Sequence, residues 1–202
     1  MHNLSNLHRF FSFKTYCLAF LAIFTVQQAN AQYIFNTDQL DRCNTAVNYK
    51  LFTAEEKLVL QIINLVRCYP KQFSYLYIET RIERWNEDPN TKSLVDELNS
   101  MSANTLLYPN DAMQLSALCW AVESGTKGIL GHDRLKCSYG YYAECCEYGS
   151  NRAIDIVLSL LIDEGVPDLG HRKIILYGEY QDVGISIQSH TKYRNCTVID
   201  FK

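Results

Sequence analysis

The sequence predicts an α+β sandwich, in which helices lie on either side of a small antiparallel sheet. Apolar residues recur at helical spacing in several segments between residues 53 and 162. Asp182–Gln188 and Asn195–Phe201 instead alternate between apolar and polar residues, which predicts a terminal hairpin. Tyr139–Tyr148 is rich in tyrosine and cysteine and is expected to be a strand or an extended loop. The chain shows no repeat and no interdomain linker, so one domain is expected.

The helices are predicted from their caps. Thr53 and Glu56 form a capping box, and the helix that they open is expected to stop at Pro70. Asn110 and Asn151 are the expected N-caps of two later helices. Further helices are predicted over residues 71–85, 91–101, 111–125 and 154–162.

The N-terminus resembles a secretory signal peptide. Residues 1–15 carry Arg9 and Lys14 without any acid, and an apolar run follows over Tyr16–Val26. The small-x-small triplet Ala29-Asn30-Ala31 then suits cleavage after residue 31. The apolar run is well short of the roughly 20 residues of a membrane-spanning helix. We therefore expect a protein that is secreted, extracellular or periplasmic, and not membrane-spanning after cleavage.

Charge limits the partners of the mature chain. Cleavage would leave 171 residues with 17 basic against 22 acidic side chains, a formal charge of −5. This length suits one domain with a proper core. No basic run remains, so nucleic acid is not an expected partner.

Seven cysteines remain after cleavage, and disulfides are their expected fate in an exported protein. We expect most of them to be oxidised, although the odd number leaves at least one thiol free. A structural zinc knot is not expected because the chain has no Cys-x-x-Cys pair. Cys145 and Cys146 are expected to point to opposite faces of an extended segment, so they bridge to separate partners or one of them is the odd thiol.

The candidate site lies between two Gly-His pairs, Gly131-His132 and Gly170-His171. Glu144 and the acidic pair Asp163-Glu164 lie between them. Two imidazoles and two carboxylates brought together by a fold make either a metal site or an acid/base cluster. The alternative is that both histidines only hydrogen-bond loops. The third histidine of the mature chain, His190, is expected to be exposed in a polar turn.

The order of these motifs resembles a known family. The motifs are Asn64-Leu65-Val66-Arg67, Gly131-His132, Glu144 ahead of Tyr148-Gly149, an apolar helix ending in an acid, Gly170-His171-Arg172-Lys173 and Val183-Gly184-Ile185. They resemble the CAP superfamily, which includes cysteine-rich secretory proteins, venom antigen five, plant pathogenesis-related proteins and SCP-like domains. The segment Gly165–Lys173 is most similar to the bacterial branch. The resemblance implies a CAP (SCP-like) domain over 53–202, which leaves an N-terminal extension over 32–52 after the expected signal peptide over 1–31.

The resemblance also implies an α-β-α sandwich with a cleft tetrad. His132 and His171 match the family's histidines, Glu144 matches its first acid, and Asp163 stands where the family usually has Glu. We expect the four side chains to converge on one solvent-accessible cleft. His132 and His171 would bind Zn²⁺ or another divalent cation, and the two acids would orient the rings or act on bound water. Because Asp is one methylene shorter than Glu, the neighbouring Glu164 is a possible substitute for Asp163.

This chain also departs from the family pattern. The sequence limits its function less closely than it limits its site. Ala143 and Cys145 replace the family's Gly and Asn around Glu144, and Leu160 replaces a Trp. The chain contains neither Gly-x-Ser-x-Gly nor His-Glu-x-x-His, so no catalytic residue is assigned. We favour a secreted binding module for a divalent metal, a small ligand, a lipid or a partner protein over an enzyme. The alternative is an extracellular metal-assisted hydrolase, a peptidase or an esterase.

Overall fold

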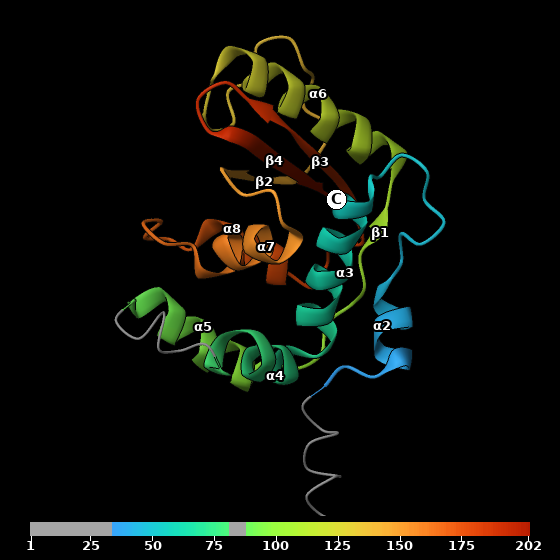
Figure 1. Cartoon of the computed structure of the whole chain (residues 1–202), viewed down its shortest axis with the longest axis vertical. Coiled ribbons are helices and arrows are strands. Elements are labelled where there is room, and N and C mark those ends of the chain that lie inside the picture. Colours follow the sequence, from blue (N-terminus) through green and yellow to red (C-terminus); the bar gives the residue numbers. More distant parts are fainter. Residues whose placement is uncertain (1–33, 81–87) are drawn as a thin grey trace, which may run out of the picture. The chain divides into compact units, whose positions relative to one another are not determined.

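The computed structural model describes residues 34–80 and 88–202, and residues 35–202 form one compact unit (Figure 1). The expected signal peptide and the last part of the helix predicted over residues 71–85 lie outside the described residues. The described helices are α2 (Thr37–Cys43), α3 (Ala54–Cys68), α4 (Pro70–Phe73), the π-helix η1 (Ser74–Ile78), α5 (Pro89–Ser100), α6 (Asp111–Lys127), α7 (Ala153–Ile162) and α8 (Gly170–Leu176). The strands are β1 (Tyr108–Pro109), β2 (Ala143–Tyr148), β3 (Asp182–His190) and β4 (Arg194–Phe201). The predicted α+β class is confirmed.

The sheet has the strand order β1-β3-β4-β2. β3 and β4 form the predicted antiparallel hairpin, and β2 pairs antiparallel with β4. β1 pairs parallel with β3, so the sheet is mixed and the expectation of a purely antiparallel sheet is wrong. The cause is a strand of two residues, which is too short to show an alternating pattern. Among the described residues β2 is an edge strand, and this position matters for the site.

Helices cover both faces of the sheet. α6 packs along β3 and β4 on one face, whereas α3, α7 and α8 contact the sheet from the other (Figure 1). The side chains of β2 show the division because Cys145 joins the larger core and Cys146 joins a smaller core beneath α6 with Trp120. The two adjacent cysteines therefore point to opposite faces, as the sequence predicts for an extended segment.

Local capping explains where most helices begin. Thr53 and Glu56 form the predicted capping box of α3, in which the Thr53 N–H donates to a Glu56 carboxylate oxygen at 2.7 Å. Asn110 caps α6 as predicted. The prediction for α7 is wrong, since its N-cap is Arg152 and not Asn151. A carboxylate from the start of α3, that of Glu55, accepts from the Ala153 N–H instead, so a neighbouring helix supplies the cap.

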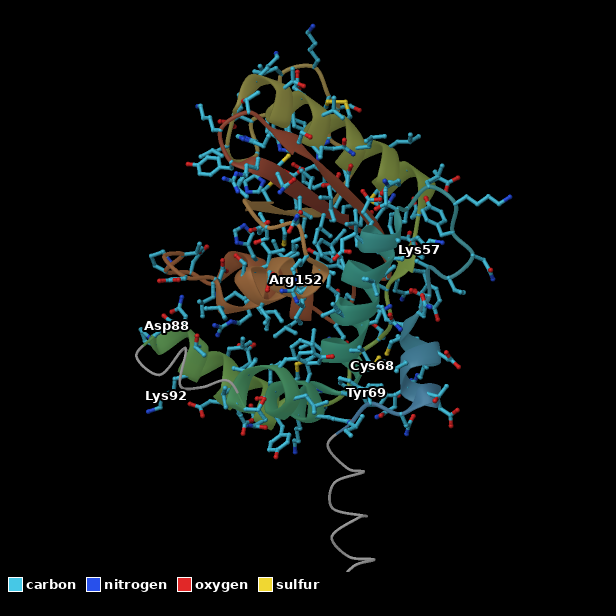
Figure 2. The ribbon with its side chains drawn as sticks, in the orientation of Figure 1. Lys57, Cys68, Tyr69, Asp88, Lys92 and Arg152 are labelled. Carbon is cyan, nitrogen blue, oxygen red and sulfur yellow. A yellow bond between two sulfur atoms is a disulfide. The ribbon has the colours of Figure 1, made fainter. Side chains whose placement is uncertain are left out.

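One disulfide, Cys119–Cys137, joins α6 to the segment that precedes β2. Five cysteines of the described chain are free and buried, so the expectation that most of the seven are oxidised is wrong in this structure: Cys43, Cys68, Cys145, Cys146 and Cys196. Buried free cysteines behave as small apolar side chains, which accounts for their places in the core. Cys43 ends α2 and Cys68, labelled in Figure 2, ends α3; the two helices contact each other, and the neighbouring Cys68 thiol raises the pKa of Cys43.

Candidate functional site

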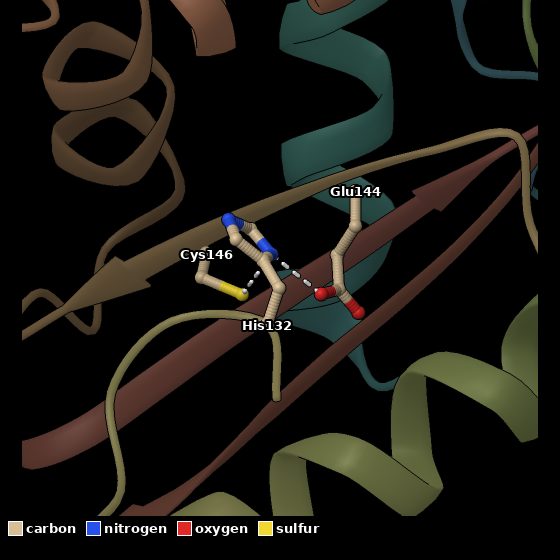
Figure 3. Close-up of side chains that lie close together, drawn as sticks. All are labelled: His132, Glu144 and Cys146. Atoms are coloured by element: carbon tan, nitrogen blue, oxygen red, sulfur yellow. Dashed lines mark hydrogen bonds and ion pairs between the residues drawn. The ribbon is translucent and has the colours of Figure 1, made fainter. Parts of the chain in front are cut away.

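The first histidine of the predicted tetrad, His132, lies in the loop after α6 and contacts β2. Its Nδ1 lies 2.7 Å from a carboxylate oxygen of Glu144 and 3.8 Å from the sulfur of Cys146 (Figure 3). Glu144 and Cys146 are two residues apart on a strand, so their side chains share one face. The Glu144 side chain is buried, whereas the His132 side chain is 50% exposed. The hydrogen bond to Glu144 thus fixes the buried side of the ring against β2, and the other side is accessible to solvent.

A buried arginine that the sequence did not single out fixes Glu144. The guanidinium of Arg134 contacts the second carboxylate oxygen of Glu144 and lies 3.0 Å from Asp200. It also lies over the ring of Tyr141, at 4.5 Å from its centroid. Glu144 and Asp200 are opposite each other in the β2–β4 register, which brings them to one guanidinium. Both oxygens of Glu144 are therefore engaged, one by a ring and one by a cation.

This network shifts several pKa values. The hydrogen bond to Glu144 raises the pKa of His132, against an opposing effect of burial. Burial favours the protonated form of Glu144, but the hydrogen bonds from His132 and Arg134 outweigh it and lower the pKa. Burial and the nearby Glu144 raise the pKa of Asp200 to about 7. One guanidinium does not neutralise two buried carboxylates, and Glu144 keeps the charge.

The second pair of the predicted tetrad is built at a helix end. Asp163 is the C-cap of α7 in the left-handed conformation, with φ 58°, and His171 lies in the first turn of α8. One carboxylate oxygen of Asp163 lies 2.7 Å from Nδ1 of His171, and the other accepts from the His171 backbone N–H at 2.9 Å. The shorter acid therefore reaches the imidazole directly, and Glu164 is not needed as its substitute. The His171 side chain is 22% exposed.

β2 links the two pairs. The thiol of Cys145 donates to the carbonyl oxygen of His171 at 3.8 Å, and Cys146 contacts His132 on the other face of the strand. The structure thus places the four predicted residues as two imidazole–carboxylate pairs beside one edge strand. That the two imidazoles are close enough to share an ion stays a prediction.

A cavity of about 560 Å³ lies beside α7 and connects with the second pair. Asp163 and His171 line it, whereas His132 and Glu144 do not. Cys146 borders the cavity from β2, although its side chain packs in the smaller core beneath α6 and contacts His132 there. Cavities of this size are typical of small-ligand sites.

The site offers two ways to hold a metal ion. His132, Glu144 and Cys146 place one ligand atom each within 4.8 Å of one another, so this group could hold an ion by itself. In addition, Nε2 of both His132 and His171 makes no hydrogen bond to the described part of the chain. Because each Nδ1 faces a carboxylate, the accessible lone pair of each ring is expected on Nε2.

The thiols near the site are poor nucleophiles. Burial is the main cause that raises the pKa of both Cys145 and Cys146 well above that of a free thiol. A nucleophilic cysteine needs a thiolate in an electropositive, accessible setting. The Cys–His contact at Cys146 is therefore better suited to packing or to metal binding than to covalent catalysis.

The structure corrects the interpretation of His190, which was expected from the sequence to be exposed. It is buried, with 3% of its surface exposed, and not free in a polar turn. Its Nδ1 accepts from the backbone N–H groups of Lys192 and Tyr193, and its Nε2 donates to the carbonyl oxygen of Ile129. This histidine shapes the β3–β4 turn and anchors it to the loop after α6.

Comparisons with known proteins leave the family open. No family model and no curated protein matches the chain. Among solved structures, an outer surface protein from Borrelia burgdorferi is similar at 15% sequence identity and a TM-score of 0.40. That match covers 48% of this chain and 77% of the other. Among the described residues, no helix has the length and apolar character needed to cross a bilayer.

Proposed function

We propose that this chain is an exported binding protein of the CAP type whose His132 and His171 bind a divalent cation, Zn²⁺ being the best fit. The observation that carries the proposal is the repeated imidazole–carboxylate pair, with an Nδ1 to oxygen distance of 2.7 Å in both cases. A carboxylate behind a histidine fixes the ring and its tautomer and makes Nε2 a better ligand, as is common in zinc sites. The chemistry of two imidazoles with open positions suits Zn²⁺.

We favour the two-histidine arrangement over the local group of His132, Glu144 and Cys146. In the local group the Glu144 oxygen that faces Nδ1 of His132 would bind the ion instead, so the ring would lose the carboxylate that orients it. Cys146 would also have to lose a proton although burial raises its pKa. Ligation through Nε2 of His132 and His171 does not compete with the bond between each Nδ1 and its carboxylate.

Binding is a better proposal than hydrolysis for this site. Glu144 and Asp163, the acids that could act on a bound water, are each engaged by an imidazole and a second donor. An ion held by two histidines and the adjoining cavity would take a small ligand, a lipid or an extracellular protein. Export is supported by the signal-like N-terminus and by the Cys119–Cys137 disulfide, a bond typical of oxidising compartments.

Calorimetric titration of Zn²⁺ into the purified mature chain tests the proposal. Substitution His132→Ala or His171→Ala should each abolish tight binding, since each removes a ligand. Cys146→Ser should keep the affinity within about threefold, and the exposed α5 substitution Asp96→Asn controls for a remote loss of charge. Binding that needs Cys146 but not His171 would assign the ion to the local group. Binding that survives both histidine substitutions would overturn the proposal.

A further inference from the structure

The cavity beside α7 contains a buried carboxyl group that the metal proposal does not use. Glu147 lines this cavity from β2 and is 6% exposed. One of its carboxylate oxygens accepts from the Ser150 backbone N–H at 3.3 Å. The other is buried and has no hydrogen-bond partner within the described residues. An unpaired buried carboxylate oxygen is costly, and in native proteins it is often kept for a role in binding.

A second unpaired polar atom lies beside it. Thr197 of β4 is fully buried, and its hydroxyl makes no hydrogen bond to the described part of the chain. Glu147 and Thr197 are directly opposite in the β2–β4 register, so both side chains stand on the same face of the sheet. Two of the three unpaired buried polar atoms in the described chain thus belong to one cross-strand pair. Of the two, Glu147 lines the cavity, whereas Thr197 lies next to it on β4 without reaching the cavity.

The charge of the cavity wall determines whether a positively or a negatively charged ligand is favoured. Four acidic side chains line the cavity, namely Glu147, Asp155, Asp163 and Glu164. No Lys or Arg lines it among the described residues. Asp163 is engaged by His171 and Asp155 lies 3.7 Å from the exposed Arg152, so Glu147 and Glu164 contribute most of the uncompensated charge. Clefts lined by one sign of charge concentrate ions of the opposite sign. The cavity therefore favours a cation and disfavours an anion.

Part of the remaining wall is apolar, and this part indicates what the body of the ligand is. Leu158, Ile162 and Val166 line the cavity next to the acids. A small inorganic cation would leave these side chains without a partner, whereas an aliphatic chain would contact them. A volume of about 560 Å³ suits a ligand of several heavy atoms and exceeds the needs of a single ion.

From this geometry we infer that the cavity binds a primary ammonium group on an aliphatic body, with the ammonium at Glu147 and the chain along α7. An ammonium group has three donors and no acceptor, so it suits a carboxylate oxygen that lacks a donor. The lysine side chain of a peptide and a free alkylamine share this chemistry. The inference does not need a metal ion, because neither Glu147 nor Thr197 belongs to the proposed metal ligands.

Calorimetric titration of the mature chain with octylamine, octanol and octanoate, in the presence of a chelator, tests the inference. The three probes share an aliphatic chain and differ in charge. Octylamine should bind about 10- to 100-fold more tightly than octanol because a charge-assisted hydrogen bond to a buried group contributes that much, and octanoate should bind most weakly. A short peptide with one lysine distinguishes the two sources, and binding of either amine supports the site. Octanol or octanoate binding as tightly as octylamine would overturn it.

Matched variants locate the ammonium. Glu147→Gln should weaken octylamine about tenfold or more, whereas Glu164→Gln, an exposed acid of the same wall, should change it less than threefold. Ser159 is exposed and lines the cavity, so Ser159→Phe should block octylamine by bulk without disturbing the core. His132→Ala should leave octylamine binding unchanged, which separates this inference from the metal proposal. Equal losses in Glu147→Gln and Glu164→Gln would overturn the assignment to Glu147.

Discussion

The two histidines of the site are held by similar hydrogen bonds but in different surroundings. His132 is tied to Glu144, whose carboxylate is shared with the buried Arg134 and so belongs to a network of charges. His171 is tied to Asp163, whose carboxylate binds only the ring and the backbone at the start of α8. The first pair depends on distant parts of the chain, and the second is built within one interhelical turn. The same contact can therefore have very different effects on stability.

The largest expected effect on stability comes from removing Arg134, the cation that contacts Glu144 of the first pair. Arg134→Ala should destabilise the chain by about 3–5 kcal/mol, because it leaves Glu144 and Asp200 buried without their partner. Urea unfolding followed by circular dichroism measures the change. Arg152→Ala, at an exposed residue, serves as the control and should stay within about 0.5 kcal/mol. A loss below about 1 kcal/mol for Arg134→Ala would contradict the network.

The disulfide is expected to restrict the position of His132 more than that of His171, because only His132 lies in the loop that it closes. Cys119–Cys137 closes a loop with a sequence separation of 18, and His132 lies inside it. The double substitution Cys119→Ser and Cys137→Ser should cost about 2–4 kcal/mol in thermal or urea unfolding. Zinc affinity should fall because the loop that carries His132 loses its anchor.

Thiol counting checks the same redox assignment directly. Denatured, unreduced mature protein should contain five free thiols, those of the buried cysteines. A count of three would mean a second bridge, for which Cys43 and Cys68 are the neighbouring pair. With either three or one free thiols, most of the seven cysteines would be oxidised, as the sequence predicts.

Glu144→Gln and Asp163→Asn compare the two carboxylates. Each should weaken Zn²⁺ binding by about 10- to 100-fold, since each removes the group that orients a ligand. Only Glu144→Gln should also lower stability by more than about 1 kcal/mol, because Arg134 then loses a charged partner. Asn tolerates the left-handed conformation of residue 163, so the fold of that turn should survive. Equal stability losses would remove the distinction between the pairs.

The smallest expected effect is a titration. The pKa of His132 should lie above the ordinary histidine value of about 6.5, because the hydrogen bond to Glu144 favours the charged ring. The pair therefore stabilises the fold fully below about 6.5, and this stability is lost as the pH rises through the raised pKa. Proton NMR of the imidazole measures the pKa, and Glu144→Gln should lower it. A pKa of His132 below about 6.5 in the native chain would contradict the pairing.

The elements that the sequence predicts correctly are those with local causes. The capping box at Thr53 and the hairpin of β3 and β4 depend on residues that are close in the chain. Asn151 is not the cap of α7 because the Glu55 carboxylate, from a helix 98 residues earlier, takes its place. Such a replacement leaves no trace in the local pattern.

The contacts of the site also fall into local ones and ones between residues far apart in the chain. His171 and Asp163 are eight residues apart, and a motif in the chain could show their pairing. The Arg134–Asp200 contact arises from the β2–β4 register, which joins residues separated by 66 positions. Glu147 escapes sequence reasoning as well, because only the absence of a partner in the described structure distinguishes it from any other acid. Motifs therefore identify the four residues of the tetrad, but they do not predict its division into two pairs, the Arg134 network or the cavity.

Zinc X-ray absorption spectroscopy on the mature chain loaded with one equivalent of Zn²⁺ tests the central claim most directly. The account predicts nitrogen and oxygen neighbours at about 2.0–2.2 Å, with the scattering pattern of two imidazoles. Loss of one imidazole should follow either His132→Ala or His171→Ala. A sulfur neighbour at about 2.3 Å would place the ion at His132, Glu144 and Cys146 and would contradict the two-histidine site.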